Sequence, residues 1–306
     1  MSAAVPQPLL LAGPTAAGKS AVALVLAEQL NGEIVSVDSM QVYRGLDIGT
    51  AKPSRAEQAR VPHHLVDIVD LTEGFDAAQF VRRATTAVAE IQARGRVPIF
   101  CGGTGLYFRA WREGLGAAPP ADAGLRAELA EASLDVLLGE LERCDPATFG
   151  VIDRQNRRRV ERAVEVLRLT GRPFITQRAP WREPAPTGDC FGLAVPRESL
   201  VARINARVDA MFRAGLVAET RELLPRGLAE NATAMQAIGY RQVVEHLRGG
   251  RDLAATIELV KIRTRQFAKR QLTWFHRQAA ATWLDVPPGQ TAAETAAAII
   301  HLRETA

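Results

Sequence analysis

The sequence predicts an α/β fold in which a parallel sheet core is interrupted by a helical insertion and followed by a helical C-terminal region. Short apolar runs alternate with stretches of helical periodicity up to residue 102 and again near residue 191, which is typical of parallel sheets. Between them, residues 116–187 show helical patterns rich in Ala, Leu, Glu and Arg. The 306 residues are 47% apolar and 24% charged, so the chain can bury a large core.

The predicted elements follow the chain in order. The apolar run 8–13 is expected to be a strand, and the helical spacing of Val22, Leu26 and Leu30 predicts a helix over 18–30. Further strands are expected at 33–38, 64–69, 97–102 and 191–196, with a helix at 77–94. Beyond the last strand, a long amphipathic pattern runs through Leu200, Ile204, Val208, Met211 and Phe212.

The insertion has recognisable ends. It opens with Ala117-Ala118-Pro119-Pro120 and closes with Pro180, Pro184 and Pro186, and prolines interrupt regular structure. We therefore expect a catalytic core formed by residues 1–115 and 188–306, and a helical insertion domain formed by residues 116–187.

Cysteine usage and the N-terminus predict a cytoplasmic protein. Cys101, Cys144 and Cys190 are far apart and odd in number, which argues against a disulfide framework and favours a reducing compartment. The apolar run at 9–11 is too short to span a membrane and follows no basic segment. No membrane association is expected.

Basic residues gather in two segments, although the net charge is only +4. Residues 154–182 hold nine arginines against Glu161 and Glu165, and residues 261–277 hold six lysines and arginines and no acid. Such segments are either solvated helix faces or tracks for phosphates, because each cation that neutralises a phosphate releases counterions. A nucleic-acid partner is therefore compatible with the charge distribution.

A phosphate-binding motif follows the first strand. Residues 13–20 fit the pattern G-x-x-x-x-G-K-[ST], and they read Gly13, Pro14, Thr15, Ala16, Ala17, Gly18, Lys19 and Ser20. Between a strand and a helix, the amides of this loop can surround phosphate oxygens. Lys19 is expected to contact the outer phosphate and Ser20 a Mg²⁺ ion. The core is therefore expected to resemble P-loop NTPases.

The motif leaves the reaction open. A kinase or NTPase would transfer the terminal phosphoryl group, whereas another enzyme could hold a diphosphate as the leaving group while its organic part reacts. Asp38 follows the strand 33–38, so its carboxylate is expected in the crevice where open α/β sheets bind ligands. It could act as a Mg²⁺ ligand, a general base or a cap. Thr104, in the glycine-rich run 102–107, would reach the same crevice.

Seven segments occur in an order that resembles the tRNA dimethylallyltransferase family, also called IPP transferases, from Gly13 to about Asp285. They are 13–20, 38–44, 47–53, 62–65, 102–107, 236–240 and 268–275. The resemblance implies transfer of a prenyl group from dimethylallyl diphosphate to the exocyclic amine of the adenosine just 3′ of the anticodon, in tRNAs that read codons beginning with U. The products would be N6-isopentenyladenosine and diphosphate.

The same resemblance implies roles for individual residues. Asp38 would take the proton from the attacking amine or orient it, with Thr104 beside it, while Lys19, Ser20 and Mg²⁺ would hold the diphosphate. Contacts to the tRNA anticodon loop would come from Asp38, Ser39, Met40, Gln41, Thr104, Arg126, Arg158, Arg159, Val160, Glu161, Arg162, Gln236, Ala237, Ile238, Gly239, Tyr240, Arg241, Lys269, Arg270, Gln271, Leu272, Thr273, Trp274, Phe275 and His276. Arg158 stands where the family has Gln, and His276 where it has Arg.

Other interpretations of these residues remain open. A prenyltransferase that uses free adenosine phosphate would need neither the insertion nor the basic C-terminal segment, and a small-molecule kinase would consume ATP. An RNA-binding module without chemistry would not need Asp38 and Thr104 in one crevice. His63 and His64 lack the companion ligands that a metal site requires, and Trp274 and Phe275 are more typical of a core than of a base-stacking surface. The protein is expected to act as a monomer.

Overall fold

The computed structural model describes residues 5–179, 181 and 189–305 of the chain. It contains two compact units. The sheet unit comprises residues 1–111 and 183–306, and the helical unit comprises residues 112–182. The end predicted for the insertion at residue 187 lies outside the described residues.

Over the described residues, the sheet unit is built on six parallel strands in the order β3-β2-β4-β1-β5-β6. The strands are β1 (Leu9–Ala12), β2 (Gly32–Val37), β3 (His63–His64), β4 (Val97–Gly102), β5 (Cys190–Ala194) and β6 (Thr282–Asp285). The parallel sheet confirms the predicted α/β fold, and β1, β2, β4 and β5 lie where strands were expected. β6 was not predicted, because four residues with a half-exposed pattern give little signal in sequence.

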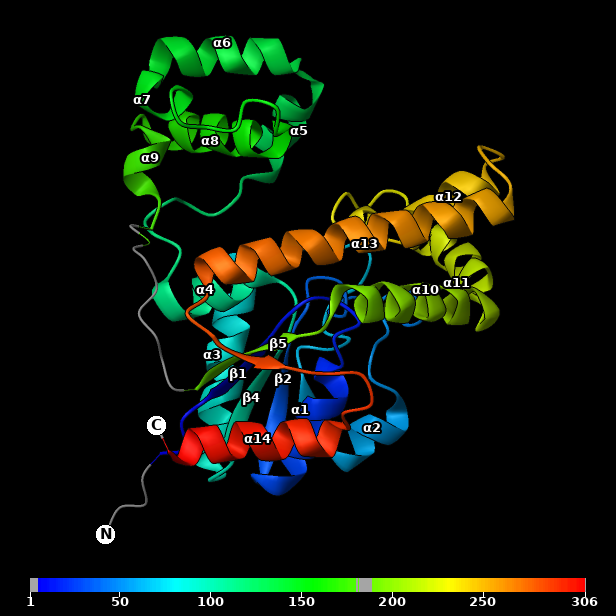
Figure 1. Ribbon diagram of the computed structural model, residues 1–306. Coiled ribbons are helices and arrows are strands. Elements are labelled where there is room, and N and C mark those ends of the chain that lie inside the picture. The colour runs from blue at the N-terminus through cyan, green and yellow to red at the C-terminus, as the bar shows by residue number, and fades with distance from the viewer. Residues whose placement is uncertain (1–4, 180, 182–188, 306) are drawn as a thin grey trace. The chain divides into compact units, whose positions relative to one another are not determined.

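Helices cover both faces of this sheet (Figure 1). Leu9 and Leu11 pack in one core with α1 (Lys19–Gln29) and α14 (Ala292–Glu304). Leu10 and Ala12 point to the opposite face, where their core includes α3 (Ala77–Ala93) and α4 (Gly105–Glu113). Alternate residues of a strand point to opposite faces, so a strand that is buried throughout needs helices on both sides.

Four longer helices form the C-terminal part of the sheet unit. They are α10 (Arg197–Arg213), α11 (Leu216–Leu223), α12 (Tyr240–Leu247) and α13 (Leu253–Gln278). The short helices η1 (Leu224–Arg226) and η2 (Ala234–Gln236) lie between α11 and α12, and α2 (Arg55–Arg60) lies between β2 and β3. Figure 1 shows α13 running beside α10. Together, α10 and α13 border the cavity described below.

The helical unit has a small core of its own. Its helices are α5 (Ala123–Glu131), α6 (Leu134–Cys144), α7 (Pro146–Phe149), α8 (Arg157–Thr170) and α9 (Phe174–Gln177). Leu129, Leu137, Leu141 and Val164 are buried among them. Asp122, Ser133, Asp145 and Asn156 cap the first turns of α5 to α8 by accepting backbone N–H bonds, which explains where these helices begin.

The strand expected over residues 64–69 ends after His64, so that prediction is wrong for most of its length. Leu65 and Asp67 adopt the left-handed backbone conformation, with φ of 64° and 55°, and a strand cannot continue through such residues. The backbone then turns toward residues 41–43, since the Ile68 amide donates to the Val42 carbonyl at 2.8 Å. The apolar pattern of this segment instead reflects burial of Leu65 and Val69.

A buried carboxylate is expected to contribute to the stability of the sheet. Glu33 in β2 is 2% exposed and pairs with His64, Arg94 and Arg96 at 2.6–3.1 Å. Burial alone would raise its pKa, but the hydrogen bonds from Arg94 and His64 outweigh burial and lower the pKa to about 2. At pH 7 we expect Glu33→Gln to lower the free energy of unfolding by about 2–3 kcal/mol, allowing for the exposure of both arginines.

The sign of the pH dependence follows from the lowered pKa. The stabilisation by Glu33 is present above the ordinary carboxyl pKa and is lost as the pH falls from about 4.5 toward 2. Urea unfolding of the wild type and of Glu33→Gln between pH 7 and pH 3 measures this contribution. The difference between their free energies of unfolding should shrink on acidification. The exposed pair of Glu28 and Arg60 supplies the control, since Glu28→Gln should change stability by less than about 1 kcal/mol. Equal effects of the two variants would contradict the expectation.

Other features bear on the predicted environment. None of Cys101, Cys144 and Cys190 is in a disulfide. Among the described residues, no helix combines the length and the apolar character needed to cross a membrane.

Candidate active site

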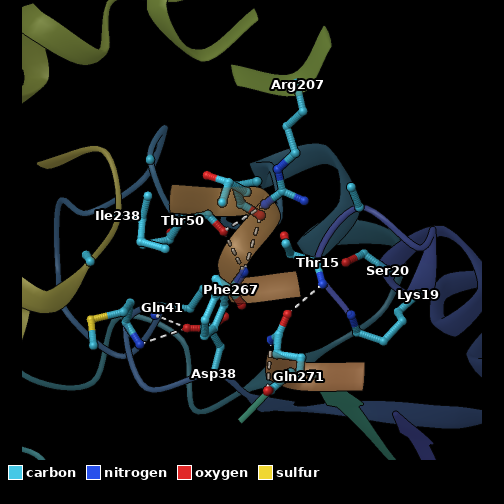
Figure 2. A pocket seen from close by; sticks show the side chains of 18 of the residues that line it. Thr15, Lys19, Ser20, Asp38, Gln41, Thr50, Arg207, Ile238, Phe267 and Gln271 are labelled. Atoms are coloured by element: carbon cyan, nitrogen blue, oxygen red, sulfur yellow. Dashed lines mark hydrogen bonds between the residues drawn. The ribbon is translucent and has the colours of Figure 1, made fainter. Parts of the chain in front are cut away.

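The loops after β1, β2 and β4 meet at the carboxyl edge of the sheet, because these strands are neighbours in the order β2-β4-β1. A cavity of about 690 Å³ opens between these loops and helices α10 and α13. Its lining includes Thr104 and also Thr15, Lys19 and Asp38, which are labelled in Figure 2. The structure therefore brings together the phosphate-binding motif and both residues predicted to be catalytic.

The backbone of the phosphate loop, residues 13–20, explains its two glycines. Gly18 precedes α1 with φ of 95°, and Gly13 has φ of 143° with the Leu193 backbone close to where a side chain would start. A larger residue would be strained at both positions. Lys19 is buried, and its Nζ donates to the Pro14 carbonyl at 2.7 Å. Burial lowers the pKa of Lys19 to about 8, and among the described residues its ammonium group is in no ion pair.

The charge around the cavity favours an anion. Its described lining carries four basic side chains and a single carboxylate: Lys19, Arg203, Arg207, Arg270 and Asp38. Burial also lowers the pKa of Arg207. Arg203 and Arg207 were missed in the sequence, although their spacing of four on α10 places both on one helical face. The spacing of the two arginines is visible in the same amphipathic pattern, whose apolar positions alone predicted the helix.

Asp38 is held so that one oxygen remains available. Its Oδ1 accepts from the amides of Met40 and Gln41 at 2.8 and 3.3 Å. This atom therefore caps the following turn, which is one of the three roles that the sequence left open. Among the described residues, no hydrogen bond engages Oδ2. The Thr104 hydroxyl accepts from the Ser39 amide at 3.2 Å, which fixes the Asp38 loop to the β4 loop.

Ser20 and Asp38 have the chemistry that a Mg²⁺ ion requires. Ser20 lies exposed in the first turn of α1 and lines the cavity with Asp38, and within the described part of the chain its hydroxyl makes no hydrogen bond. Hydroxyl and carboxylate oxygens are ligands that Mg²⁺ prefers, with water and phosphate oxygens completing the shell. These residues therefore fit the ion.

The segment 236–241 divides between the cavity and the core. Gln236, Ala237 and Ile238 line the cavity. Tyr240 is fully buried, and its hydroxyl donates to Glu219 at 2.5 Å and accepts from the Gly49 amide at 3.0 Å. The Tyr240 side chain therefore fixes the cavity-lining loop at Gly49, and the tRNA contact expected of this residue stays a prediction.

Tyr240→Phe is expected to affect stability rather than RNA binding. The change removes two hydrogen bonds, one to a carboxylate, and should lower the free energy of unfolding by about 1–3 kcal/mol. Urea unfolding measures this loss, and filter binding of tRNA should show less than about a twofold change in Kd. An unchanged free energy of unfolding together with a clearly higher Kd for tRNA would instead support a direct RNA contact by the Tyr240 side chain.

The eight residues 269–276 occupy every side of α13. Lys269, Arg270, Thr273 and His276 are exposed. Phe275 is buried against Phe108, and Trp274 packs on Gly105. Phe275 is thus a core residue, as interpreted, whereas Trp274 is only partly buried against the same core. Gln271 is buried, Leu272 is half-buried, and Gln41, also expected to contact RNA, bonds internally to Ser36 and Thr50.

In the helical unit, some predicted RNA contacts have internal partners. Arg126 and Arg162 both donate to buried Glu165; burial would raise the pKa of Glu165, but these bonds outweigh it and lower the pKa. Glu161 pairs with Arg157 at 2.6 Å. The Val160 side chain is fully buried, so the contact expected of this residue stays a prediction for its backbone alone. Of the residues expected to contact RNA on α8, Arg158 and Arg159 are exposed.

Comparison with known proteins agrees with this geometry. Residues 41–278 match the family model described as IPP transferase. A tRNA dimethylallyltransferase 1 from Trichlorobacter lovleyi is 46% identical over 299 residues, which are 96% of this chain and 98% of that protein. A tRNA dimethylallyltransferase from Halorhodospira halophila is 48% identical over 278 residues, which are 88% of this chain and 90% of that protein.

Solved structures give the same result. The full-length tRNA isopentenylpyrophosphate transferase of Bacillus halodurans superposes with a TM-score of 0.71 at 39% identity, covering 98% of this chain and 97% of that one. A eukaryotic dimethylallyltransferase acting on tRNA superposes with a TM-score of 0.70 at 27% identity, covering 92% and 74%. From the family model and these relatives together, the chain belongs to the IPP transferase family.

Proposed function

We propose that the protein is a tRNA dimethylallyltransferase. It transfers the dimethylallyl group from its diphosphate to the exocyclic amine of the adenosine 3′ of the anticodon, in tRNAs that read codons beginning with U. The observation that carries the proposal is the cavity itself, in which a phosphate loop and three arginines surround a single carboxylate. Membership of the IPP transferase family supports the same activity.

The diphosphate is bound by the basic side of the cavity. Amides of the loop 13–20, with Lys19, Arg203 and Arg207, neutralise the charge that grows on the leaving group. Burying five carbons contributes about 4 kcal/mol, whereas micromolar binding requires about 8 kcal/mol. The phosphate contacts therefore supply roughly half of the binding free energy. A Mg²⁺ ion held by Ser20 and by phosphate oxygens would add positive charge at the leaving group.

The acceptor amine lies on the side of Asp38. Its nitrogen attacks the allylic carbon, the carbon–oxygen bond to diphosphate breaks, and the proton lost by nitrogen passes to Asp38. The open Oδ2 is the acceptor for that proton, because Oδ1 already accepts two amides. Thr104, bonded to the Ser39 amide, keeps the Asp38 loop in place.

Two basic surfaces recognise the RNA. One is on α8 of the helical unit at Arg158 and Arg159, and the other is on α13 at Lys269 and Arg270. An anticodon-loop adenine must leave its stack to reach a cavity, which costs a few kcal/mol. Phosphate contacts offset this cost and make the affinity fall with salt. The monomer holds both surfaces and acts alone.

The test is a product analysis. The protein is incubated with Mg²⁺, unmodified tRNA and dimethylallyl diphosphate, the RNA is digested, and mass spectrometry searches for an adenosine heavier by one C5H8 unit. In one parallel reaction free adenosine monophosphate replaces tRNA, and in another ATP replaces the prenyl donor. Prenylated RNA supports the proposal. Prenylation of free nucleotide alone, or consumption of ATP, would refute the RNA-modifying function.

A further inference from the structure

Gln271 reaches from α13 into the floor of the cavity. Its side chain is 7% exposed, and its Oε1 accepts from the Thr15 amide at 2.8 Å while its Nε2 donates to the Gly103 carbonyl at 2.9 Å (Figure 2). Both ends of the carboxamide are therefore used. The two partners belong to different loops, one after β1 and the other after β4.

The contact with Gly103 is a close one. A Cβ atom at this position would lie 2.1 Å from the Gln271 Nε2, a distance at which atoms overlap. Glycine is needed here for the carboxamide to reach the backbone. The bridge thus depends on the absence of a side chain at Gly103.

The bridge joins the two sides of the site. Thr15 belongs to the loop that surrounds the diphosphate, whereas Gly103 precedes Thr104, whose hydroxyl accepts from the Ser39 amide beside Asp38. A chain of hydrogen bonds therefore runs from the phosphate loop through Gln271 to the Asp38 loop. A shift of one loop is transmitted to the other.

From this geometry we propose that Gln271 is a positioning residue that sets the distance between the leaving group and Asp38. The inference rests on the proposed function and assigns Gln271 to the phosphate loop in place of the tRNA contact that the family resemblance implied. Its neighbours Lys269 and Arg270 are exposed on the same helix, Arg270 at the cavity, so α13 combines exposed cations with one buried amide that holds the reacting geometry.

The expected effect is on chemistry and diphosphate binding. Misplacing reacting groups by about 1 Å can slow a reaction by about 10²-fold, and a loop that must order on binding weakens affinity. For Gln271→Met, which keeps the length of the side chain but loses both hydrogen bonds, we expect roughly tenfold weaker binding of inorganic diphosphate with Mg²⁺. The single-turnover rate should fall about 100-fold.

The experiment compares three proteins as full chains. Gln271→Met is measured beside the wild type and beside Gln266→Ala, a change on the same helix at an exposed position whose partner is Arg263. Calorimetry gives the affinity for inorganic diphosphate, filter binding gives the Kd for tRNA, and a chemical quench gives the single-turnover rate. Circular dichroism and urea unfolding confirm that each variant is folded.

The outcomes separate the alternatives. Weaker diphosphate binding and a slower rate in Gln271→Met, with a tRNA Kd within twofold of wild type, support the bridge. Wild-type diphosphate affinity in Gln271→Met overturns it, and so does a loss confined to the tRNA Kd. If the wild type binds diphosphate but prenylates no RNA, the proposed function fails, while the calorimetric comparison still decides whether Gln271 positions the phosphate loop.

Discussion

Replacing Asp38 by asparagine is expected to lower the single-turnover rate of prenyl transfer by about 10²–10⁴-fold, the range that a general base contributes. Asparagine can still accept from the Met40 and Gln41 amides through its Oδ1, so the loop is retained. It cannot take up a proton. The affinities for diphosphate and tRNA should therefore change little while the rate falls.

The Asp38→Asn experiment also separates the roles that the sequence left open. A residue that only capped the turn would tolerate asparagine, and a Mg²⁺ ligand would be rescued in part by a higher Mg²⁺ concentration. The matched control is Asp70→Asn, because Asp70 is exposed and pairs with Arg44. A variant that keeps more than about a tenth of the wild-type rate would place the base on another residue.

Lys19→Met is expected to weaken diphosphate binding by about 10- to 100-fold, since a hydrogen bond to a charged group contributes about 1.5–3 kcal/mol. The single-turnover rate should fall a further 10²–10³-fold, because the developing negative charge loses a placed donor. Calorimetry and a chemical quench measure the two effects. Lys261→Met is the control for diphosphate affinity, since its ammonium group is held by Asp209 and Glu258.

The pH dependence gives an independent check on Lys19. Burial lowers its pKa to about 8 in the free protein, so the ammonium form predominates below that value and is lost as the pH rises through it. Diphosphate affinity of the wild type should therefore fall above about pH 8. Lys19→Met should show no such fall, and a parallel decline in both proteins would assign the titration to another group.

Much of the site could be predicted from sequence because it is encoded locally. The phosphate loop has an eight-residue pattern, and Asp38 and Thr104 each follow an apolar strand. In a parallel sheet the carboxyl ends of neighbouring strands share one edge. Local patterns therefore predict that these residues share one crevice.

The side-chain directions could not be predicted in the same way. Successive residues of an α-helix are turned by about 100°, so eight consecutive positions such as 269–276 face every side. A sequence motif therefore identifies positions in the chain but does not determine which helix face each side chain occupies. Phe275 and Tyr240 are therefore buried although they belong to such segments. Arg203 and Arg207 line the cavity from α10, for which the sequence pattern predicted only the apolar face.

The pairing of β1 with β5 has a consequence for how the chain is made. Leu10 pairs with Cys190, so the ribosome must synthesise the intervening residues before this edge of β1 finds its partner. At ~5–20 residues per second, that delay is on the order of 10–40 s. The helical unit carries its own buried core and can fold during the delay. Its folding reduces the length of unfolded chain between β1 and β5. An apolar strand edge is meanwhile open to other nascent chains, which makes early chaperone contact with residues 9–12 an expected feature of its biosynthesis.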